Sequence, residues 1–361
     1  MASDQEIRYC TSRDGTRLAY ASLGSGPLIV RAAVWLTQLE LDRQNLLSRH
    51  WIAELTRHHE LLRYDGRGCG LSEREVKRIS MQAWIEDLEA VTDAAGRERF
   101  ALLGVSQGAA IAVGYAARHP ERVSHLILYG GCARGALRRD PPQKVVDVLN
   151  GMLKAAELGW GADSSSFRQV FISQLCHDAS AAQQRAIDEA QRLTISGANA
   201  VRFMREVYDI DVREWAPRVR CPTLVFHAKE DPCFPVEEGR LLASLIPNAR
   251  FVALSSKNHL PFETEPAWRA FLAELRGFLP GFPPAASFAD AAPEPETISL
   301  TPRQLEILRE VGNGQTDKQI ARKLSLSPRT VEMHVARALA ALRCRTRAEA
   351  VRRAAELKLL A

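Results

Sequence analysis

The sequence lacks a cysteine pattern, a long apolar run and an apolar leader, and each absence excludes a class of protein. Its seven cysteines are odd in number, scattered and without a CxxC pair, which excludes a disulfide framework and a zinc site. No stretch approaches the ~18 uninterrupted apolar residues of a transmembrane helix. The first residues, MASDQEIRYC, carry early acidic side chains and no apolar signal core. We therefore expect a soluble cytoplasmic protein with no membrane partner, no metal and no other cofactor.

The small net charge conceals an uneven distribution. The 361 residues sum to +5, yet the stretch from Ile298 to the end holds 13 Lys and Arg against 6 Asp and Glu. That stretch therefore carries +7 and the remainder carries −2. A basic excess in one short region is the pattern that polyanion binding requires, although a solvated helical surface produces the same bias.

Strand-like apolar runs alternate with helix-length amphipathic segments, which predicts an α/β domain with a mainly parallel sheet. The strands are expected at Leu28–Arg31, Glu60–Tyr64, Phe100–Leu103, Ser124–Tyr129, Thr223–His227 and Arg250–Leu254. Between about 134 and 218 the alternation stops, and we expect either a helical cap over the carboxyl edge of the sheet or ordinary peripheral helices. A Pro/Ala-rich stretch over 281–297 predicts a linker between domains at 1–280 and 298–361.

A serine motif follows the strand expected at 100–103. The letters GVSQG at 104–108 match G-x-S-x-G, with Ser106 at the centre and a helix-forming run behind it. Such a strained strand-to-helix turn needs small flanking residues, and the following helix presents free N–H groups to a developing oxyanion. The alternative is a glycine-flanked turn with an inert serine.

An acid and a histidine follow this serine in the order Ser, acid, His. Asp231 lies in HAKEDPCFP after the strand at 223–227, where a loop could direct its carboxylate at a histidine. His259 lies in SSKNHLPF after the strand at 250–254. Glu230 is a rival acid, but Asp231 fits the motif better.

With these residues, the chain from 1 to about 280 resembles the α/β-hydrolase superfamily. The segment RYDGRGCGLSE at 63–73 is similar to its structural D-x-R-G-x-G-x-S loop. The resemblance implies an α/β-hydrolase fold with Ser106 as nucleophile, His259 as general base and Asp231 orienting the imidazole. A small ester, lactone or thioester would then lie between the sheet edge and the cap. Its pocket is expected to include Trp35, Val105, Phe234 and Leu260.

In this family the loop after the third strand supplies an N–H group to the oxyanion, and the sequence of that loop is different in this chain. Where relatives usually have His-Gly after the third strand, this chain reads PLIVRAAVWLT, with Ala32 and Ala33 at those positions. Gln107 should still donate its backbone N–H, and the second donor would come from Val34 or Trp35. Because losing one donor costs roughly 10²–10³ in rate, turnover would be slow or specialised.

Residues 298–361 contain closely spaced helix starts. A capping box at 301–304 has proline at the first helical position, a second box lies at 316–319, and Ser327 caps a third helix. Only 325–327 separates the second and third helices, the short turn of a helix-turn-helix. In the third helix one buried stripe is expected, formed by Val331, Val335, Ala338 and Leu342.

This segment closely resembles the LuxR/FixJ-type DNA-binding domain, whose pattern L-T-x-R-x-x-E-x-L, K-x-I-A and L-x-x-S-x-x-T-V-x-x-H is almost fully present. The resemblance implies four helices, a homodimer and double-stranded DNA as partner. Base or phosphate contacts are expected from Lys318, Arg329, Thr330, Glu332, Met333, Ala336 and Arg337. Ala336 stands where relatives often have a basic residue, so their base preference is not transferred. A helical dimerisation module is the alternative.

Together the two regions predict a transcriptional regulator. Its hydrolase-fold domain would sense a small ester-, lactone- or thioester-like ligand, either by holding it or by hydrolysing it. The alternative is an active serine esterase whose DNA-binding tail is a secondary module. A third hypothesis is that the hydrolase-fold domain is a pseudoenzyme. Covalent labelling of Ser106 would exclude this hypothesis.

Overall fold

The computed structural model describes residues 5–161, 166–177, 179–282, 300–324, 326–342, 344, 346–356 and 359. The chain divides into two units, Met1–Ala285 and Ala286–Ala361, and each is described by itself. The linker predicted over 281–297 lies outside the described residues except for its first two positions.

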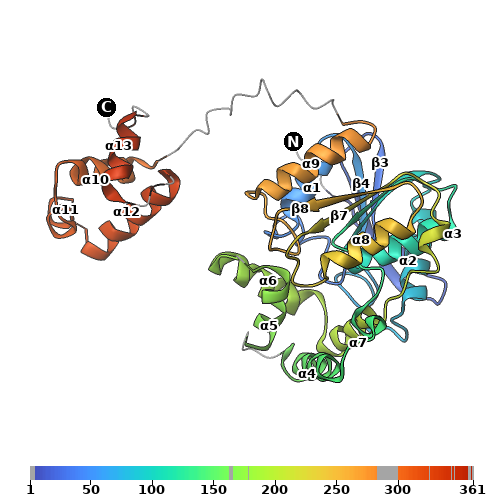
Figure 1. Ribbon diagram of the computed structural model, residues 1–361. Helices are drawn as coiled ribbons and strands as arrows, with labels where there is room; N and C mark the ends of the chain where they lie inside the picture. Colours follow the sequence, from blue (N-terminus) through green and yellow to red (C-terminus); the bar gives the residue numbers. More distant parts are fainter. Residues whose placement is uncertain are drawn as a thin grey trace. The chain divides into compact units, whose positions relative to one another are not determined.

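The first unit is built on an eight-stranded sheet (Figure 1). The strands are β1 Arg8–Thr11, β2 Arg17–Leu23, β3 Leu28–Arg31, β4 Glu60–Tyr64, β5 Phe100–Val105, β6 Val123–Tyr129, β7 Thr223–Ala228 and β8 Ala249–Leu254. Their order is β1-β2-β4-β3-β5-β6-β7-β8; β1 and β2 run antiparallel to their neighbours, and β3 to β8 are parallel. The parallel strands match the predicted ones apart from small differences at their ends, whereas the sequence pattern does not predict β1 and β2.

Helices cover both faces of the sheet (Figure 1). One face carries α1 (Arg49–Leu55) and α9 (Pro266–Phe278), and the other carries α2 (Met81–Ala94), α3 (Gln107–Arg118) and α8 (Val236–Leu245). All residues of β5 and β7 are therefore buried, as continuous apolar runs in a doubly covered sheet require. In the described part of the chain, no helix has both the length and the apolar character needed to cross a bilayer.

Four further helices lie between β6 and β7. They are α4 (Gln143–Gly159), α5 (Ser166–Leu175), α6 (Ala181–Thr194) and α7 (Gly197–Tyr208). Residues of α4, α5 and α7 line a cavity together with Ser106, which directly follows β5. These helices therefore lie over the carboxyl edge of the sheet, within the segment where either a cap or peripheral helices were expected.

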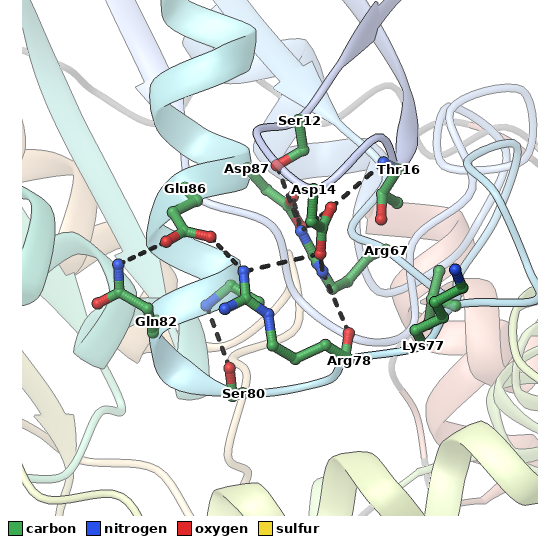
Figure 2. A network of polar contacts seen from close by, with 12 residues as sticks. Ser12, Asp14, Thr16, Arg67, Lys77, Arg78, Ser80, Gln82, Glu86 and Asp87 are labelled. Atoms are coloured by element: carbon green, nitrogen blue, oxygen red, sulfur yellow. Dashed lines mark hydrogen bonds and ion pairs between the residues drawn. The ribbon is translucent and has the colours of Figure 1, made fainter.

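A buried ion-pair network fixes the glycine-rich loop after β4 (Figure 2). The Arg67 guanidinium donates to Asp87 of α2 at 2.8 and 2.6 Å and to Asp14, in the turn between β1 and β2, at 2.6 Å. Arg78 extends the network by joining Asp14 to Glu86 (Figure 2). A fully buried arginine needs such partners, so the network holds the first two strands, the loop and α2 together.

Asp65 supports the same loop from inside. One of its carboxylate oxygens, Oδ2, accepts the backbone N–H groups of Leu39 at 3.2 Å and Leu71 at 2.9 Å. Gly70 has φ +52°, and a Cβ there would lie 2.2 Å from this oxygen, so only glycine fits. Burial, together with the charge of Asp42, raises the pKa of Asp65 to about 7. The loop therefore has the structural role that the resemblance implies.

The second unit contains α10 (Pro302–Gly312), α11 (Asp317–Lys323), α12 (Pro328–Leu342) and α13 (Arg347–Glu356). The Thr301 side chain accepts from the Gln304 N–H and the Gln304 side chain accepts from the Thr301 N–H, which completes the first predicted capping box. The stripe predicted on the third helix is buried at all its positions, Val331, Val335, Ala338 and Leu342.

Candidate active site and DNA-binding face

Ser106 occupies the sharp turn between β5 and α3. Its backbone has φ 55° and ψ −130°, a region that costs an L-residue energy and persists only when the surroundings impose it. A Cβ at Gly104 would lie 2.6 Å from the Cα of Ala109, and one at Gly108 would lie 3.1 Å from the carbonyl oxygen of Ala33. Both glycines of the motif are therefore needed for the close approach of backbone segments that fixes the serine.

His259 and Asp231 form a buried hydrogen-bonded pair. The Nδ1–H of His259 donates to Oδ2 of Asp231 at 2.7 Å, and both side chains are 0% exposed. The other carboxylate oxygen accepts the N–H groups of Cys233 at 2.7 Å and Phe234 at 3.1 Å. Burial acts to raise the pKa of Asp231, but the charge and hydrogen bond of His259 outweigh it and lower that pKa. The structure thus supplies an ionised acid beside the imidazole.

His259 leaves its second ring nitrogen, the buried Nε2, without a hydrogen-bond partner among the described residues, Ser106 included. His259 and Ser106 line the same cavity. Other buried histidine nitrogens, such as Nδ1 of His59 and Nδ1 of His227, also have no partner in the described part of the chain, so it is the cavity shared with Ser106 that distinguishes Nε2 of His259.

The loops that carry this pair are held from two directions. Glu265 accepts three hydrogen bonds from the segment around His259. From the other side, the backbone N–H of His259 donates to the carbonyl of Leu175 at 3.0 Å, and the Cys233 thiol donates to the carbonyl of Gln174 at 2.9 Å. The last residues of α5 are therefore bonded to both the acid loop and the histidine loop.

Two backbone N–H groups are available beside Ser106. Among the described residues, the N–H of Gln107 and the N–H of Val34 meet no acceptor. Gln107 begins α3, and its side-chain amide donates to the Ala33 carbonyl at 3.2 Å, which holds the altered loop against the helix. Gln107 and Val34, the predicted oxyanion donors, each line a cavity that Ser106 also lines.

Two cavities meet at Ser106. The smaller has a volume of about 60 Å³, and its lining includes His259 and the predicted pocket residues Val105 and Leu260. The larger has about 220 Å³, lies under α4, α5 and α7, and includes the predicted pocket residue Phe234. Trp35 lines both, and its ring packs against Trp160 at the end of α4 with centroids 5.4 Å apart.

Two residues that contact the His–Asp pair or its loop belong to none of the motifs found in the sequence. Gly130, directly after β6, has φ +57°, and a Cβ there would lie 3.0 Å from Cε1 of His259. His227, at the end of β7, donates through Nε2 to the carbonyl of Phe234 at 2.9 Å and lies 3.4 Å from Oδ2 of Asp231. A Gly-Gly pair after a strand and a histidine four residues before the acid are the sequence signals that could have revealed them.

The acid loop also brings together possible metal ligands. Side-chain atoms of Asp231, Cys233 and His259 lie within 4.8 Å of one another. Asp231 and His259 are hydrogen-bonded to each other, and burial raises the pKa of the Cys233 thiol well above its usual range. A protonated thiol is a poor ligand, so this set is better suited to moving a proton than to holding a metal.

In the second unit, the predicted DNA-contacting residues of α11 and α12 lie mainly on the surface. The exposed ones are Lys318, Arg329, Glu332, Met333 and Ala336. The Thr330 side chain is half-buried, and its hydroxyl is hydrogen-bonded to that of Ser327 at 2.8 Å. The side chain of Arg337 lies outside the described residues.

The basic side chains of α11 differ in their partners. Lys318 forms no ion pair with a described residue, whereas Lys323 pairs with Glu310 at 2.8 and 2.9 Å. The two lysines look alike in sequence, and only the structure separates them. Lys318 is therefore the better candidate for a phosphate contact, because its charge is not already neutralised.

The fold and these two surfaces define a hydrolase-type α/β protein joined to a helix-turn-helix unit. Residues 44–266 match the family model described as alpha/beta hydrolase fold, and residues 298–354 match the model of the bacterial regulatory proteins of the luxR family. The chain belongs to the alpha/beta hydrolase fold family and carries a LuxR-type DNA-binding domain at its C-terminal end. The predicted fold class and the predicted fusion are thus confirmed.

The proteins similar to the chain include proteins named as hydrolytic enzymes. A putative carbamate hydrolase, RutD, of Azorhizobium caulinodans is 30% identical over 264 residues, which are 71% of this chain and 89% of that protein. Pyrrolizixenacetamide deacetylase of Xenorhabdus hominickii is 27% identical over 236 residues, 64% of this chain and 84% of that protein. These likenesses relate the hydrolase-fold unit to hydrolytic enzymes.

Solved structures agree in fold. A hydrolase from Pseudomonas aeruginosa PA01 has a TM-score of 0.62 at 24% identity and covers 76% of this chain and 98% of its own. The enol-lactonase from Burkholderia xenovorans LB400 has a TM-score of 0.62 at 22% identity, with 75% and 99% covered. At these identities the likeness establishes the fold alone.

Proposed function

We propose that this chain is a ligand-responsive transcriptional regulator whose hydrolase-fold unit binds and slowly cleaves a small ester-, lactone- or thioester-like compound. One observation supports this most strongly. A strained serine lines one cavity together with the histidine of a buried His–Asp pair and also lines a second cavity, in the same chain as a LuxR-type domain. A site of this kind has the means to recognise a carbonyl compound, and the attached domain has the means to report it at DNA.

In the proposed reaction, the Ser106 hydroxyl attacks the ligand carbonyl carbon and passes its proton to Nε2 of His259. Asp231 orients the imidazole and stabilises its positive charge. The N–H groups of Gln107 and Val34 donate to the oxyanion. The carbon–oxygen or carbon–sulfur bond then breaks, and His259 returns the proton to the leaving group. Water, deprotonated by the same histidine, hydrolyses the acyl-serine and releases the acid.

The proposed output is sequence-specific binding of double-stranded DNA by a homodimer, as the LuxR-type domain implies. On α12, Glu332 would accept from a cytosine amino group, and Met333 or Ala336 would contact thymine methyl groups. Lys318 and Arg329, exposed and basic, would contact phosphates and so position the domain without specifying sequence.

The test uses the full chain, a fluorophosphonate probe and a DNA site selected from a random pool. We expect the probe to label Ser106, candidate esters to compete with it, and a competing ester to change DNA affinity by about fivefold or more, a typical coupling between two sites. The regulator proposal fails if an ester that protects Ser106 leaves DNA affinity unchanged. Absence of labelling would remove the proposed nucleophile while leaving ligand sensing open to direct measurement.

A second candidate is an esterase whose DNA-binding domain has only a minor role. The buried, hydrogen-bonded His–Asp pair favours it, because a pure receptor does not need an oriented imidazole. In that case turnover would be fast, and ligand and DNA would bind independently of each other. Measuring DNA affinity during and after ester turnover separates the two proposals.

A further inference from the structure

The two cavities at Ser106 differ in chemistry as well as in size. His259, which must protonate the leaving group, lines the smaller cavity and not the larger one. In the reaction proposed above, the leaving group would therefore lie in the cavity of about 60 Å³ and the acyl part in the cavity of about 220 Å³. A cavity of about 150 Å³ accommodates benzene, so the site takes a compact leaving group and an extended acyl part.

The larger cavity is lined mainly by apolar side chains, with Gln107, Gln174 and Tyr208 among its polar residues and a single cation. Its lining includes Val145, Leu149 and Phe171, and Arg139 is the only residue in it with a formal charge among the described ones. Burial raises the pKa of the Cys233 thiol and of the Tyr208 hydroxyl in the same wall. Neither group therefore supplies a negative charge to the guanidinium at neutral pH.

The neighbouring arginines show that this lack of a partner is specific to Arg139. Arg134 pairs with Glu238 at 2.8 Å, and Arg138 pairs with Asp209 at 2.8 Å. Arg139 follows directly, at the end of the short helix Ala136–Arg139, and forms no ion pair or hydrogen bond with a described residue. It is half-buried, so its charge is partly removed from solvent. A ligand anion in the cavity would give this cation the partner that the described residues do not supply.

We infer that the ligand is an acyl compound with a distal carboxylate, bound by Arg139 in the larger cavity, and with a small leaving group on the His259 side. A guanidinium matches a carboxylate through two parallel hydrogen bonds. A dianionic phosphate fits less well, because one cation would leave an uncompensated negative charge among apolar side chains. The substrate class is therefore the monoester of a dicarboxylic acid.

This inference rests on the proposed function and specifies its ligand. In the reaction, Ser106 forms a bond to the ester carbonyl carbon, and the bond to the alkoxy oxygen breaks. The alcohol leaves with the proton that His259 took from the serine. Water then adds to the acyl-serine, which gives back the serine hydroxyl and yields the dicarboxylate with one released proton.

The test compares monomethyl esters of dicarboxylic acids, from succinic to sebacic, with methyl esters of monocarboxylic acids of the same chain lengths. For the full chain we expect kcat/KM to favour the best monoanionic ester by about ten- to a hundredfold, the range that a charge-assisted hydrogen bond provides. Arg139→Gln should abolish this preference, and Arg139→Lys should retain part of it. Arg138→Gln, next in sequence but paired with Asp209, should leave the preference unchanged.

Binding measured without turnover separates this inference from the proposed catalysis. Calorimetry on the Ser106→Ala chain, with and without Arg139→Gln, should show the same Arg139-dependent preference for the monoanionic ester. If that preference is present but the wild type cleaves nothing, the proposed reaction fails and the inference stands. Turnover or binding without a preference for the anion overturns the inference, as does failure of both ester series to bind.

Discussion

The two units position their functional groups in opposite ways. In the hydrolase-fold unit, the side chains of Asp231 and His259 are completely buried, and both residues are fixed by hydrogen bonds to each other and to nearby backbone groups. In the DNA-binding unit, Lys318 and Arg329 are exposed, and only the helices beneath them are fixed by packing. Acyl transfer needs groups preorganised to a fraction of an ångström, away from water. Attraction to phosphates acts through solvent and tolerates mobile side chains.

This comparison predicts different sensitivities for the two units. Buried charges in the first unit should make its activity and stability depend on single partners and on pH. Exposed charges in the second unit should make its DNA affinity depend on salt and be shared among many residues. The following substitutions test the contrast.

The largest effect is expected for Ser106→Ala. It should eliminate fluorophosphonate labelling and reduce ester turnover by roughly 10⁴-fold or more, because the nucleophile acts as a unit with its base. DNA affinity without ligand should change by less than about twofold, since Ser106 belongs to the hydrolase-fold unit and not to the DNA-binding unit. Asp231→Asn serves as a second variant and should also lower turnover by about 10⁴-fold through the wrong imidazole tautomer. Residual turnover at the wild-type rate in either variant would contradict the proposed roles.

The next effect concerns stability. Arg67→Met leaves Asp14 and Asp87 without their buried partner and should reduce the free energy of unfolding by about 3–5 kcal/mol. Arg78→Met, in the same network but 43% exposed, should cost less than about 1 kcal/mol. All six tryptophans lie at or before Trp268, so their fluorescence in urea reports on this unit alone. Equal losses in the two variants would refute the importance of burial.

A smaller effect depends on pH. Because the pKa of Asp65 is raised to about 7, the folded chain keeps a proton that the unfolded chain loses above its usual pKa of ~3.9. Raising the pH from about 5 to about 8 should therefore destabilise the wild type relative to Asp65→Asn, by up to about 1.4 kcal/mol per pH unit below pH 7. Urea titrations at the two pH values measure the difference.

Asp14 provides the control for this pH effect. Its hydrogen bond from Arg67 lowers its pKa, so its contribution to stability is complete above ~3.9 and is lost only as the pH falls further. The difference between wild type and Asp14→Asn should therefore stay constant between about pH 5 and pH 8. The assignment of the pH effect to Asp65 would be wrong if the difference in unfolding free energy between wild type and variant changed with pH for Asp14→Asn. It would also be wrong if that difference stayed constant for Asp65→Asn.

The smallest effect is expected at the DNA-binding face. Lys318→Ala should weaken binding to any sequence by roughly three- to tenfold at about 0.15 M salt and reduce the salt slope by about 1. Lys323→Ala should change the DNA affinity and its salt slope less than Lys318→Ala does, because Glu310 already neutralises Lys323. Fluorescence anisotropy on specific and random duplexes at several salt concentrations measures both quantities. A larger effect at Lys323 would show that the ion pair opens when DNA binds.

Local patterns predict those parts of the molecule whose physical cause is local. The parallel strands are continuous apolar runs because helices cover both their faces, and the turn at Ser106 needs two glycines that the sequence displays. β1 and β2 are not predicted, because Arg8–Thr11 is short and largely exposed and carries no clear alternation. Their place in the sheet depends on pairing with β4, which the local sequence does not encode.

The candidate active site also has parts that the local sequence predicts and parts that it does not. Motif and order predict Ser106, Asp231 and His259, and the structure brings the latter two into contact. The importance of Arg139 has no local signal, because three arginines follow one another closely and look alike in sequence. They differ in the structure only because Glu238 and Asp209, distant in sequence, pair with two of them.

The end of α5 has a consequence for the lifetime of a signal. Leu175 and Gln174 form part of the cavity wall, and their carbonyls also accept from the histidine loop and the acid loop. A displacement of α5 would break both hydrogen bonds and so would disturb the histidine and the acid together. In the proposed regulator, the time for which the protein remains occupied would then depend on how the rate of cleavage compares with the rate of release.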